Sequence, residues 1–369
     1  MKYKMNVALL SRAECNALRG LAIIGIFLHN YCHWLGPVVK ENEYQFFKRN
    51  ADWFSQVASN PDYLWPMHIL SFFGHYGVPI FLFLSAYGLE RKYGATSTAT
   101  AQGHDGVGET WMFVKKHYLK LFQMMFVGFA CFVFVDAITP GRWHYSTLQI
   151  VAQLGMFNNL LPEPDQNIWP GPYWFFGLML QLYIVYRLLL YRRHWAWTVT
   201  LMALCIGGQL CLGPESEALN RYRYNFMGGM LPFGMGLLFA RHGQRVILVN
   251  LSTVALLMSL VVTTFFVVGF GNNFWGWMLV PALVCYAAVY FVKSLKSVPA
   301  NVVTDTIWKA LQWMGGVSAA LFVVHPAIRK VFIPISQHGD TYAGLLLYTI
   351  ASIGAAWLVN EIMKKIKMG

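Results

Sequence analysis

Ionisable and polar side chains inside an apolar stretch are the first residues of this sequence that could carry out chemistry. The stretch 18–35 places Arg19 near its start and His29, Asn30 and His33 near its end. Such groups are costly within an apolar helix in a membrane, so they are candidates for function. An imidazole can act as a general base, and an arginine can hold a phosphate or a carboxylate.

The helical spacing of these residues indicates which of them could act together. His29 and His33 are four residues apart and would lie on one helix face. From Arg19 a helix rises about 15 Å to His29 and about 21 Å to His33. A cation at one end and an imidazole farther along could serve an anionic donor and a general base on one path. Alternatively, Arg19 could anchor the helix at the membrane interface, and the two histidines could form hydrogen bonds between helices.

Two further groups of polar residues lie at the ends of apolar runs. Ser85 and Tyr87 place hydroxyl groups near the end of the run 68–89. Lys116 and Lys120 lie around the start of the next run, share a helix face and could bind phosphates. They could equally be cations that set the orientation of the helix in the membrane.

The remaining reactive side chains form no compact motif. His325 precedes Pro326 in the run 311–332, so its imidazole could either cap the interrupted helix backbone or contact a substrate. The six cysteines are scattered and form no closely spaced pairs. We therefore expect them to be small buried apolar residues rather than disulfides or zinc ligands, and we expect no metal.

The composition explains what must position these residues. Of the 369 residues 57% are hydrophobic and 16% aromatic, whereas only 12% are charged, about half the usual share in soluble proteins of roughly a quarter. A soluble chain could not bury so much apolar surface. In a membrane protein a net charge of +12 reflects cations near an anionic leaflet rather than nucleic-acid binding. We therefore predict an all-α integral membrane protein that does not bind nucleic acid.

Ten apolar runs are candidates for membrane-spanning helices. They predict a bundle of about ten transmembrane helices in a single domain over residues 1–369. The runs are 17–36, 68–89, 117–138, 173–191, 195–213, 226–240, 246–270, 273–292, 311–332 and 341–363. The apolar segment 147–161 is too short to span, so we expect it to be re-entrant or interfacial.

The charges predict an orientation for this bundle. Eighteen of the 28 Lys and Arg residues fall on the side that holds both termini, and eight fall on the other side. The positive-inside rule then places both termini in the cytoplasm, in the inner or plasma membrane. Residues 37–67 would form an extracytoplasmic loop, whose aromatic residues favour a folded cap. Residues 90–116 would form a cytoplasmic loop that contains the flexible, Gly- and Thr-rich stretch 93–110.

Five stretches, taken in order, resemble membrane-bound acyltransferase family 3, whose members O-acylate carbohydrates. They are LRGLAIIGIFLHN in the first run, GHYGVPIFLFLSAYGL in the second, FVKKHYLKL before the third, YWFFGLMLQLY in the fourth and SAALFVVHP in the ninth. The resemblance covers most of the chain, and the order of the motifs is more specific than any one of them. The sequence departs from the family pattern at three places: Ala86 replaces a glycine, Lys116 and Lys120 replace the common arginines, and no Glu follows Trp174.

The resemblance also implies roles for individual residues. The Arg and His of the first motif correspond to Arg19 and His29, although nine residues separate them here and ten in the usual pattern, so His33 remains an alternative base. His29 would activate an acceptor hydroxyl or form a covalent acyl-His. The donor would be acetyl-CoA or another acyl-CoA, bound from the cytoplasm at Arg19, Lys116, Lys120, Ser85 and Tyr87. The carbohydrate acceptor would contact His33, Asn30, Trp174 and His325.

Two other classes of function remain open on the sequence. The polar first run could be the path of a transporter or flippase, but that class predicts inverted repeats and more acidic residues within the spans than occur here. The scaffold could also be a non-catalytic subunit of a glycan-export system. In each case membrane lipids surround the chain, and the sequence does not determine its oligomeric state.

Overall fold

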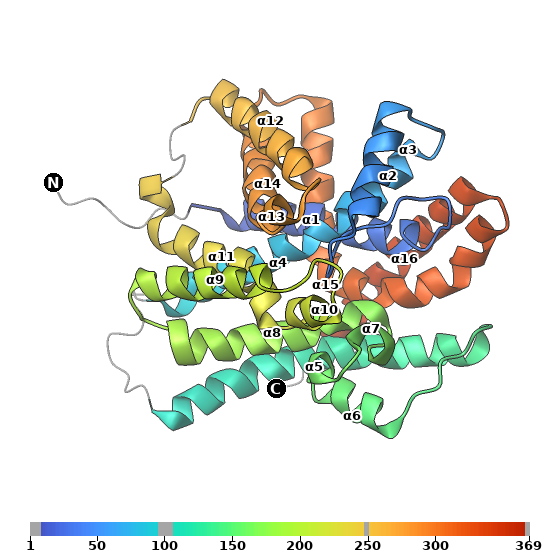
Figure 1. Cartoon of the computed structure of the whole chain (residues 1–369), viewed down its shortest axis with the longest axis horizontal. Helices are drawn as coiled ribbons and strands as arrows, with labels where there is room; N and C mark the ends of the chain where they lie inside the picture. Colours follow the sequence, from blue (N-terminus) through green and yellow to red (C-terminus); the bar gives the residue numbers. More distant parts are fainter. Residues whose placement is uncertain (1–8, 95–105, 247–250, 366–369) are drawn as a thin grey trace.

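Helices form all the regular structure in the part of the chain that the structure describes, which comprises residues 9–94, 106–246 and 251–365. The structure is a computed structural model (Figure 1). It confirms the predicted all-α fold, and helices cover most of the described residues of each of the ten predicted spans. These helices are α1 (Arg12–Cys32), α3 (Trp65–Phe73) with α4 (Gly77–Tyr93), α5 (Val107–Ile138), α8 (Trp174–Val185), α9 (Trp195–Leu210), α11 (Phe226–Val246), α12 (Thr253–Phe270), α14 (Val280–Ser297), α15 (Val302–Gln337) and α16 (Thr341–Lys365).

Short helices and turns connect or extend these elements. They are α2 (Lys48–Ser59), η1 (Gly74–Tyr76), α6 (Thr147–Leu154), η3 (Asn158–Leu160), α7 (Pro164–Asn167), η4 (Gly171–Tyr173), the π-helical turn η5 (Tyr186–Leu190), α10 (Glu217–Tyr224) and α13 (Phe274–Trp277). The segment 147–161 therefore forms α6 and η3, neither of which is long enough to cross a membrane.

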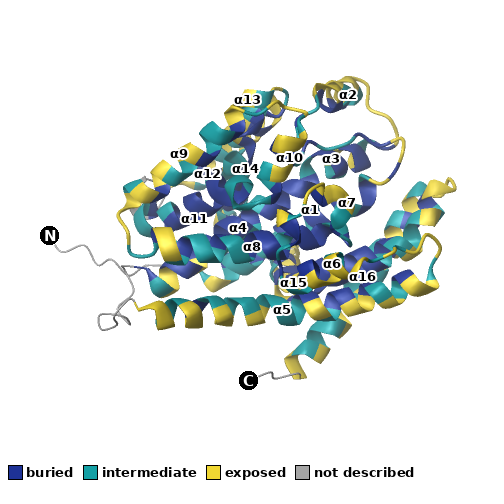
Figure 2. Cartoon of the chain, turned by 60° about the horizontal axis from the view of Figure 1, so that its bottom comes forward, coloured by how far each residue is buried: buried dark blue, intermediate teal, exposed yellow. Residues whose placement is uncertain are grey.

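Six segments of the described chain are long and apolar enough to cross a membrane. They are Trp65–Tyr93, Val107–Ile138, Gly171–Leu190, Thr253–Phe270, Val302–Gln337 and Thr341–Lys365. Large apolar side chains on α12 and α16 are exposed, among them Phe265 and Leu346, as expected for helices that face lipid. Figure 2 shows the complementary pattern, in which α1, α4 and α11 are mostly buried while α5 and α16 carry exposed residues.

Helix α1 packs against α3, α4, α14, α15 and α16, and both of its ends are capped. Ser11 and Glu14 form a capping box at its start, where Glu14 also forms an ion pair with Lys293. At its end, the Lys40 ammonium donates hydrogen bonds to the carbonyls of His33 and Leu35. Cations are favourable at the carbonyl end of a helix. The last turn of α1, which carries His29, is therefore held in place from outside the helix.

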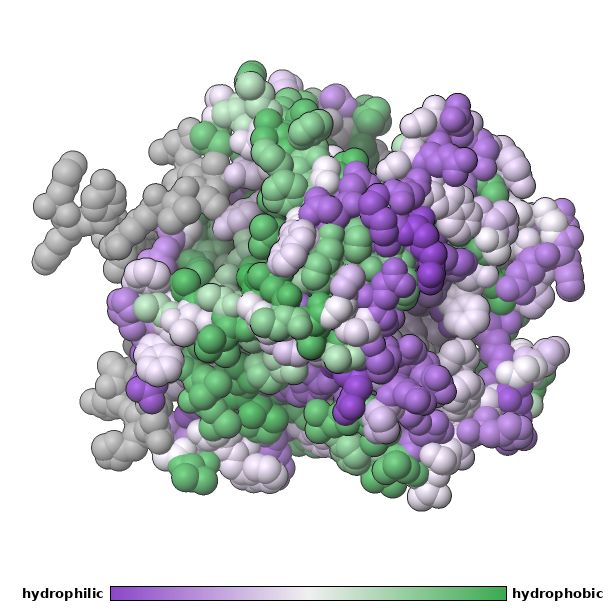
Figure 3. Space-filling model, viewed as in Figure 1, coloured by the Kyte–Doolittle hydropathy of each residue, from purple (hydrophilic) through white to green (hydrophobic). Residues whose placement is uncertain are grey.

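Residues 37–67 fold over one end of the bundle. Phe46, Ala51 and Phe54 of this segment are buried against Phe72 and against Trp277 at the end of α13. Hydrophilic side chains gather on the part of the surface over α7 and α10, whereas apolar side chains dominate over α8, α9 and α12 (Figure 3). The polar part of this face therefore coincides with helices that are too short to span a membrane.

Two boundaries differ from the sequence prediction. The predicted loop 90–116 is partly helical, because α4 continues to Tyr93 and α5 begins at Val107. These helix ends carry charged residues, so the apolar run in the sequence stops before the helix does. The predicted flexible stretch 93–110 falls largely on residues outside the described chain. All six cysteines are free, as predicted, although Cys131 and Cys211 are exposed rather than buried.

Candidate active site

A chamber of about 380 Å³ lies at the end of the bundle that residues 37–67 cover, and we call it the His29 chamber. It is lined by residues of α1, η1, α4, α7, η4, α8, α10 and α15 and of the segments that follow α1 and α7. Its ionisable lining residues are His29, His33, Glu41, Glu43, His75, Asp165 and Arg329. Its aromatic lining residues include Trp34, Tyr44, Trp169, Trp174, Phe175, Tyr224 and Phe322. Of the four residues predicted to contact the acceptor, His33, Asn30 and Trp174 line this chamber together with His29.

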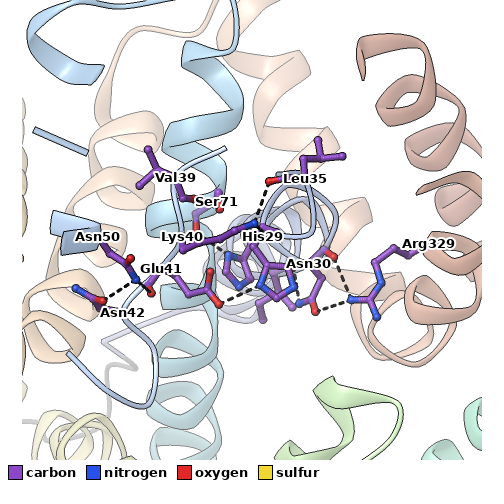
Figure 4. A network of polar contacts seen from close by, with 12 residues as sticks. His29, Asn30, Leu35, Val39, Lys40, Glu41, Asn42, Asn50, Ser71 and Arg329 are labelled. Carbon is purple, nitrogen blue, oxygen red and sulfur yellow. Dashed lines mark hydrogen bonds and ion pairs between the residues drawn. The ribbon is translucent and has the colours of Figure 1, made fainter. Parts of the chain in front are cut away.

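The His29 imidazole is buried and held by a single backbone contact. Its Nδ1 lies 2.8 Å from the carbonyl oxygen of Ser71 in α3 (Figure 4). A carbonyl only accepts hydrogen bonds, so Nδ1 carries the proton, and the lone pair of a neutral His29 is on Nε2. Gly25 and Gly74 allow this contact, because a Cβ on Gly74 would lie 2.6 Å from the Gly25 carbonyl oxygen and 2.7 Å from the His29 Cβ.

His33 and Glu41 form a second, adjacent pair. The His33 Nδ1 lies 3.0 Å from Glu41 Oε1, and the His33 ring centroid lies 4.7 Å from that of His29. Carboxylates accept hydrogen bonds, so this contact places the proton of a neutral His33 on Nδ1, just as the Ser71 carbonyl does for His29. Among the described residues, His33 Nε2 and Glu41 Oε2 have no hydrogen-bond partner. Both histidines could therefore present an Nε2 lone pair to the chamber. Of the two, only His33 has its Nδ1 hydrogen-bonded to a carboxylate.

The same cluster could hold a metal ion. The potential ligand atoms of His29, His33 and Glu41 lie within 4.8 Å of one another. His75 lies close by, with its ring 5.4 Å from that of His29 and with neither ring nitrogen hydrogen-bonded in the described chain. Histidine nitrogens and a carboxylate oxygen suit zinc and similar divalent ions. An imidazole whose Nε2 bound a metal could not also accept a proton, so the two uses of His29 exclude each other.

Charges around the chamber shift the pKa values of the two glutamates in opposite directions. Burial alone would raise the pKa of Glu41, but the adjacent His33, which donates a hydrogen bond to it, holds that pKa well below its usual range. Burial and the negative charge of Glu41 raise the pKa of Glu43 to about 8. At neutral pH, Glu41 is therefore an acceptor of hydrogen bonds, while Glu43 is mostly protonated and can also donate one.

Arg329 of α15 places a positive charge against the opposite wall of the chamber. Its Nη1 donates a hydrogen bond to the Asn30 carbonyl oxygen at 3.1 Å, and its guanidinium carbon lies 4.7 Å from the centre of a Trp34 ring. Figure 4 shows the Arg329 and Asn30 side chains on one side of His29 and Glu41 on the other. The chamber thus has the carboxylate of Glu41 at one wall and the guanidinium of Arg329 at the opposite wall.

A second chamber, of about 430 Å³, lies toward the other end of the bundle, and we call it the Lys120 chamber. Its polar lining residues are Ser85, His117, Lys120, Gln123, Tyr183, Ser318, Asn360 and Lys364, and the others are mainly phenylalanine, methionine and leucine. Two of the five residues predicted to bind the donor, Lys120 and Ser85, line it. The Lys120 chamber therefore has polar groups and two lysines along a mostly apolar cavity.

Three other residues predicted at the donor site do not line either chamber in the described chain. Tyr87 instead accepts a hydrogen bond from the Leu10 amide at its hydroxyl, which ties the start of α1 to α4. Lys116 is exposed, one turn before Lys120. Arg19 donates a hydrogen bond to the Asn16 side chain, one turn back along α1.

His325 also lies outside both linings. It is fully buried, and its Nδ1 lies 3.1 Å from the carbonyl oxygen of Leu321, one turn back along α15. The imidazole is therefore tied to the backbone of its own helix, next to Pro326. Its ring lies 6.0 Å from that of Phe322, which lines both chambers.

The sequence did not single out several residues that the structure brings to the chambers. Glu41 and Glu43 lie in the segment between spans, where charged residues are ordinary, and their positions depend on how that segment folds back. His75, in GHYG, and Arg329, three residues after Pro326, are ionisable residues in apolar runs, a pattern that could have identified them. Lys364 follows the last apolar run, where a cation typically sets the orientation of the helix in the membrane.

Comparison with known proteins agrees with this geometry. The family model described as an acyltransferase domain, that of acyltransferase family 3, matches residues 12–361. The match therefore extends over nearly the whole chain and includes every residue of both chambers except Met363 and Lys364. Comparisons with curated proteins and with solved structures give no match. The chain belongs to acyltransferase family 3 and is a multi-pass membrane acyltransferase.

Proposed function

We propose that this protein transfers an acyl group, in particular acetyl, from cytoplasmic acyl-CoA to a hydroxyl of an extracytoplasmic or lipid-linked carbohydrate. The observation that carries the proposal is the arrangement of two chambers in one bundle. The His29 chamber holds ionisable and aromatic residues under the folded segment 37–67, and the Lys120 chamber holds lysines at the end of the bundle near Lys364. On the orientation that the charges predict, the Lys120 chamber faces the cytoplasm and the His29 chamber faces the opposite side.

The Lys120 chamber has the chemistry that an acyl-CoA needs. CoA carries a 3′-phosphate and a pyrophosphate, which Lys120 and Lys364 could bind, and a long uncharged pantetheine arm that an apolar cavity could hold. The chamber extends along α8 from Tyr183 to Phe175, eight residues and about 12 Å of helix. A donor bound by its phosphates at the lysine end could therefore carry its thioester toward the His29 chamber.

The His29 chamber has the chemistry that a carbohydrate needs. The rings of Tyr44, Trp174 and Tyr224 pack together at this wall, with Tyr44 and Tyr224 stacked at 3.9 Å between centroids. Aromatic faces suit the apolar faces of sugar rings, and Glu41, Asp165 and Asn220 offer partners for hydroxyl groups. These residues would position one hydroxyl near Nε2 of His29.

The proposed reaction uses the tautomer that Ser71 imposes. The Nε2 lone pair of neutral His29 takes the proton of the acceptor hydroxyl while that oxygen attacks the thioester carbon. The carbon–sulfur bond then breaks, and the CoA thiolate leaves with the proton that His29 received. The same lone pair could instead attack the thioester and form an acyl-His that the acceptor later cleaves. Trapping of an acylated protein in the absence of acceptor distinguishes the two routes.

Lys116 and Lys120 provide a matched test of the donor site. They lie one turn apart on α5, but only Lys120 lines the chamber. CoA should raise the melting temperature of the purified wild type. The variant Lys120→Ala should weaken this stabilisation several-fold, more so at low salt, while Lys116→Ala should change it little.

The outcome decides between the classes of function. Equal effects of the two lysine substitutions would show that the donor does not bind in this chamber. A wild type that CoA does not stabilise at millimolar concentration would contradict the use of acyl-CoA. A transporter or a non-catalytic glycan-export subunit would then be the better explanation.

A further inference from the structure

Phe175 of α8 and Phe322 of α15 line both chambers, and they are the residues that the two linings share in the described chain. Their ring centroids lie 5.1 Å apart at an interplanar angle of 54°. This is ordinary contact distance for two aromatic rings. The boundary between the His29 chamber and the Lys120 chamber is therefore formed by two side chains in contact.

The surroundings of the pair differ on its two sides. Phe322 is buried and rests against Phe176, with ring centroids 5.8 Å apart, and against His325. Phe175 is only partly buried, and its ring neighbours on the Lys120 side, Phe81 and Phe176, lie 6.3 Å and 6.4 Å away between centroids. Because Phe175 is only partly buried, a rotation about its side-chain bonds could separate the two rings.

We propose that Phe175 and Phe322 form a gate through which the acyl thioester passes from the Lys120 chamber to the His29 chamber. This inference rests on the proposed function, because it takes the donor to enter from the Lys120 chamber. While the rings are in contact, they separate the thioester from the acceptor hydroxyl and from water in the polar chamber. The gate thereby limits both the size of the acyl group and the loss of donor to hydrolysis.

Loss of a ring should expose the thioester to water. With no acceptor present, a water molecule in the His29 chamber gives its proton to Nε2 of His29, and its oxygen attacks the thioester carbon. The carbon–sulfur bond breaks, a carboxylic acid forms, and the CoA thiolate takes the proton from His29. The released thiol reports this reaction directly, so the experiment needs no knowledge of the acceptor.

The test measures thiol release from acetyl-CoA and from butyryl-CoA by the purified full-length protein in proteoliposomes without acceptor. We expect Phe175→Ala and Phe322→Ala each to raise this rate at least about tenfold over wild type. The gain should be larger for butyryl-CoA, because one methylene in a tight apolar passage changes rates by about 10–200-fold. Adding His29→Ala to either variant should abolish the gain.

Phe129→Ala is the matched control. Phe129 is a phenylalanine of α5, buried to 8% exposure against 7% for Phe322, and it lines neither chamber in the described chain. It should hydrolyse both donors at the wild-type rate. Phe322→Leu keeps most of the buried volume, so it serves if Phe322→Ala does not fold, and it should show a smaller gain.

Failure of the gate and failure of the proposed function give different results. Gate variants that CoA stabilises as it does the wild type, but that hydrolyse both donors at the wild-type rate, would overturn the gate alone. An equal gain in Phe129→Ala would do the same, because the effect would then be general loosening of the bundle. Absence of CoA-dependent stabilisation in the wild type would contradict the proposed function instead.

Discussion

The imidazole of His29 shows how one backbone contact can define the chemistry of a side chain. The Ser71 carbonyl fixes the proton on Nδ1, and burial keeps the ring in the wall of the chamber. His33, its neighbour on the same helix face, is oriented by Glu41 instead. In both rings the proton is on Nδ1, so Nε2 could act as a base. The Ser71 contact holds His29 to the backbone of a helix, whereas Glu41, which orients His33, lies in a connecting segment. This difference favours His29 as the base.

Substitution of each histidine distinguishes these roles. His29→Ala should lower the rate of acyl transfer by about 10²–10⁴, the range for loss of a general base, while CoA still stabilises the protein. His33→Ala should cost less, because Nε2 of His29 remains. Transfer assays on both variants, with CoA-dependent melting as the control for folding, measure this. Full activity in His29→Ala together with loss in His33→Ala would assign the base to His33.

The opposite pKa shifts of Glu41 and Glu43 predict opposite effects of pH on stability. Glu43 has a pKa of about 8 in the folded protein and about 4.3 when unfolded, so folding favours its protonated form. Its stabilising contribution is complete below about pH 4.3 and is lost as pH rises toward 8. Relative to wild type, Glu43→Gln should therefore become more stable between pH 5 and pH 8, on the order of a few degrees in melting temperature.

Glu41→Gln is the control for this pH effect. The pKa of Glu41 is lowered on folding, so its contribution is present above about pH 4.3 and is lost only at lower pH. At pH 5 the variant should be less stable than wild type, and its stability should fall less as pH rises to 8, because the negative charge of Glu41 helps to raise the pKa of Glu43. Thermal-shift curves at several pH values measure both differences. A difference between Glu43→Gln and wild type that does not change with pH would show that burial does not raise the pKa of Glu43.

At the scale of elements, the site depends on how closely α1 approaches the segment from α3 to α4. That segment is interrupted by the 3₁₀ turn η1, and Gly74 at this turn packs directly on the backbone of α1 at Gly25. The interruption brings both the Ser71 carbonyl and the His75 ring to His29. Pairs of small residues allow such backbone contact between helices in membranes.

Gly74→Ala should therefore impair the site as well as the packing. Its Cβ would lie 2.6 Å from the Gly25 carbonyl oxygen, closer than van der Waals contact, so the two helices must separate. We expect the stability to fall by about 1–3 kcal/mol. The activity should fall further than this loss of folded protein explains, because the contact between His29 and the Ser71 carbonyl lengthens. Melting temperature and transfer rate measure the two effects.

Gly316→Ala is the matched control, since a Cβ there meets nothing within 4 Å. It should leave melting temperature and activity close to wild type. Equal behaviour of the two variants would mean that the approach of α1 to η1 does not position His29.

At the scale of the whole molecule, the bundle separates a surface that suits lipid from two internal chambers. Exposed apolar side chains lie on the outer helices, whereas buried polar side chains such as His29, His75 and Arg329 lie inside. The two chambers follow one another along α8 and α15, which both contribute to each lining. Transfer across the bundle would require that these two ends face different sides of the membrane.

The orientation can be tested by labelling cysteines from outside intact cells. Tyr63 is 72% exposed in the segment that covers the His29 chamber, so Tyr63→Cys should react with a membrane-impermeant thiol reagent. A cysteine tag after residue 369 should react only after permeabilisation, because the excess of cations predicts a cytoplasmic C-terminus. Labelling of the tag in intact cells would reverse the predicted topology and with it the assignment of the donor side. Wild type is needed for comparison, since Cys131 and Cys211 are exposed.

The sequence by itself determined the features that follow from composition and local pattern. Apolar runs predicted the helices, because each must bury its backbone groups within a membrane. Motif order predicted the family, and ionisable residues in an apolar run predicted His29, Asn30 and His33 as lining residues of a site. These properties depend on neighbours in the chain, so they can be read without knowing how the helices pack.

Only the tertiary structure decided which distant residues join them. The segment after α1 returns Glu41 to His33, and the turn at Gly74 sets the Ser71 carbonyl against His29. Lys116 and Lys120 share a helix face in sequence, yet packing of α5 against its neighbours leaves only Lys120 at a chamber wall. Phe175 and Phe322 are ordinary apolar residues of two spans until α8 and α15 bring their rings into contact. Such contacts depend on the relative placement of whole helices, which no local pattern encodes.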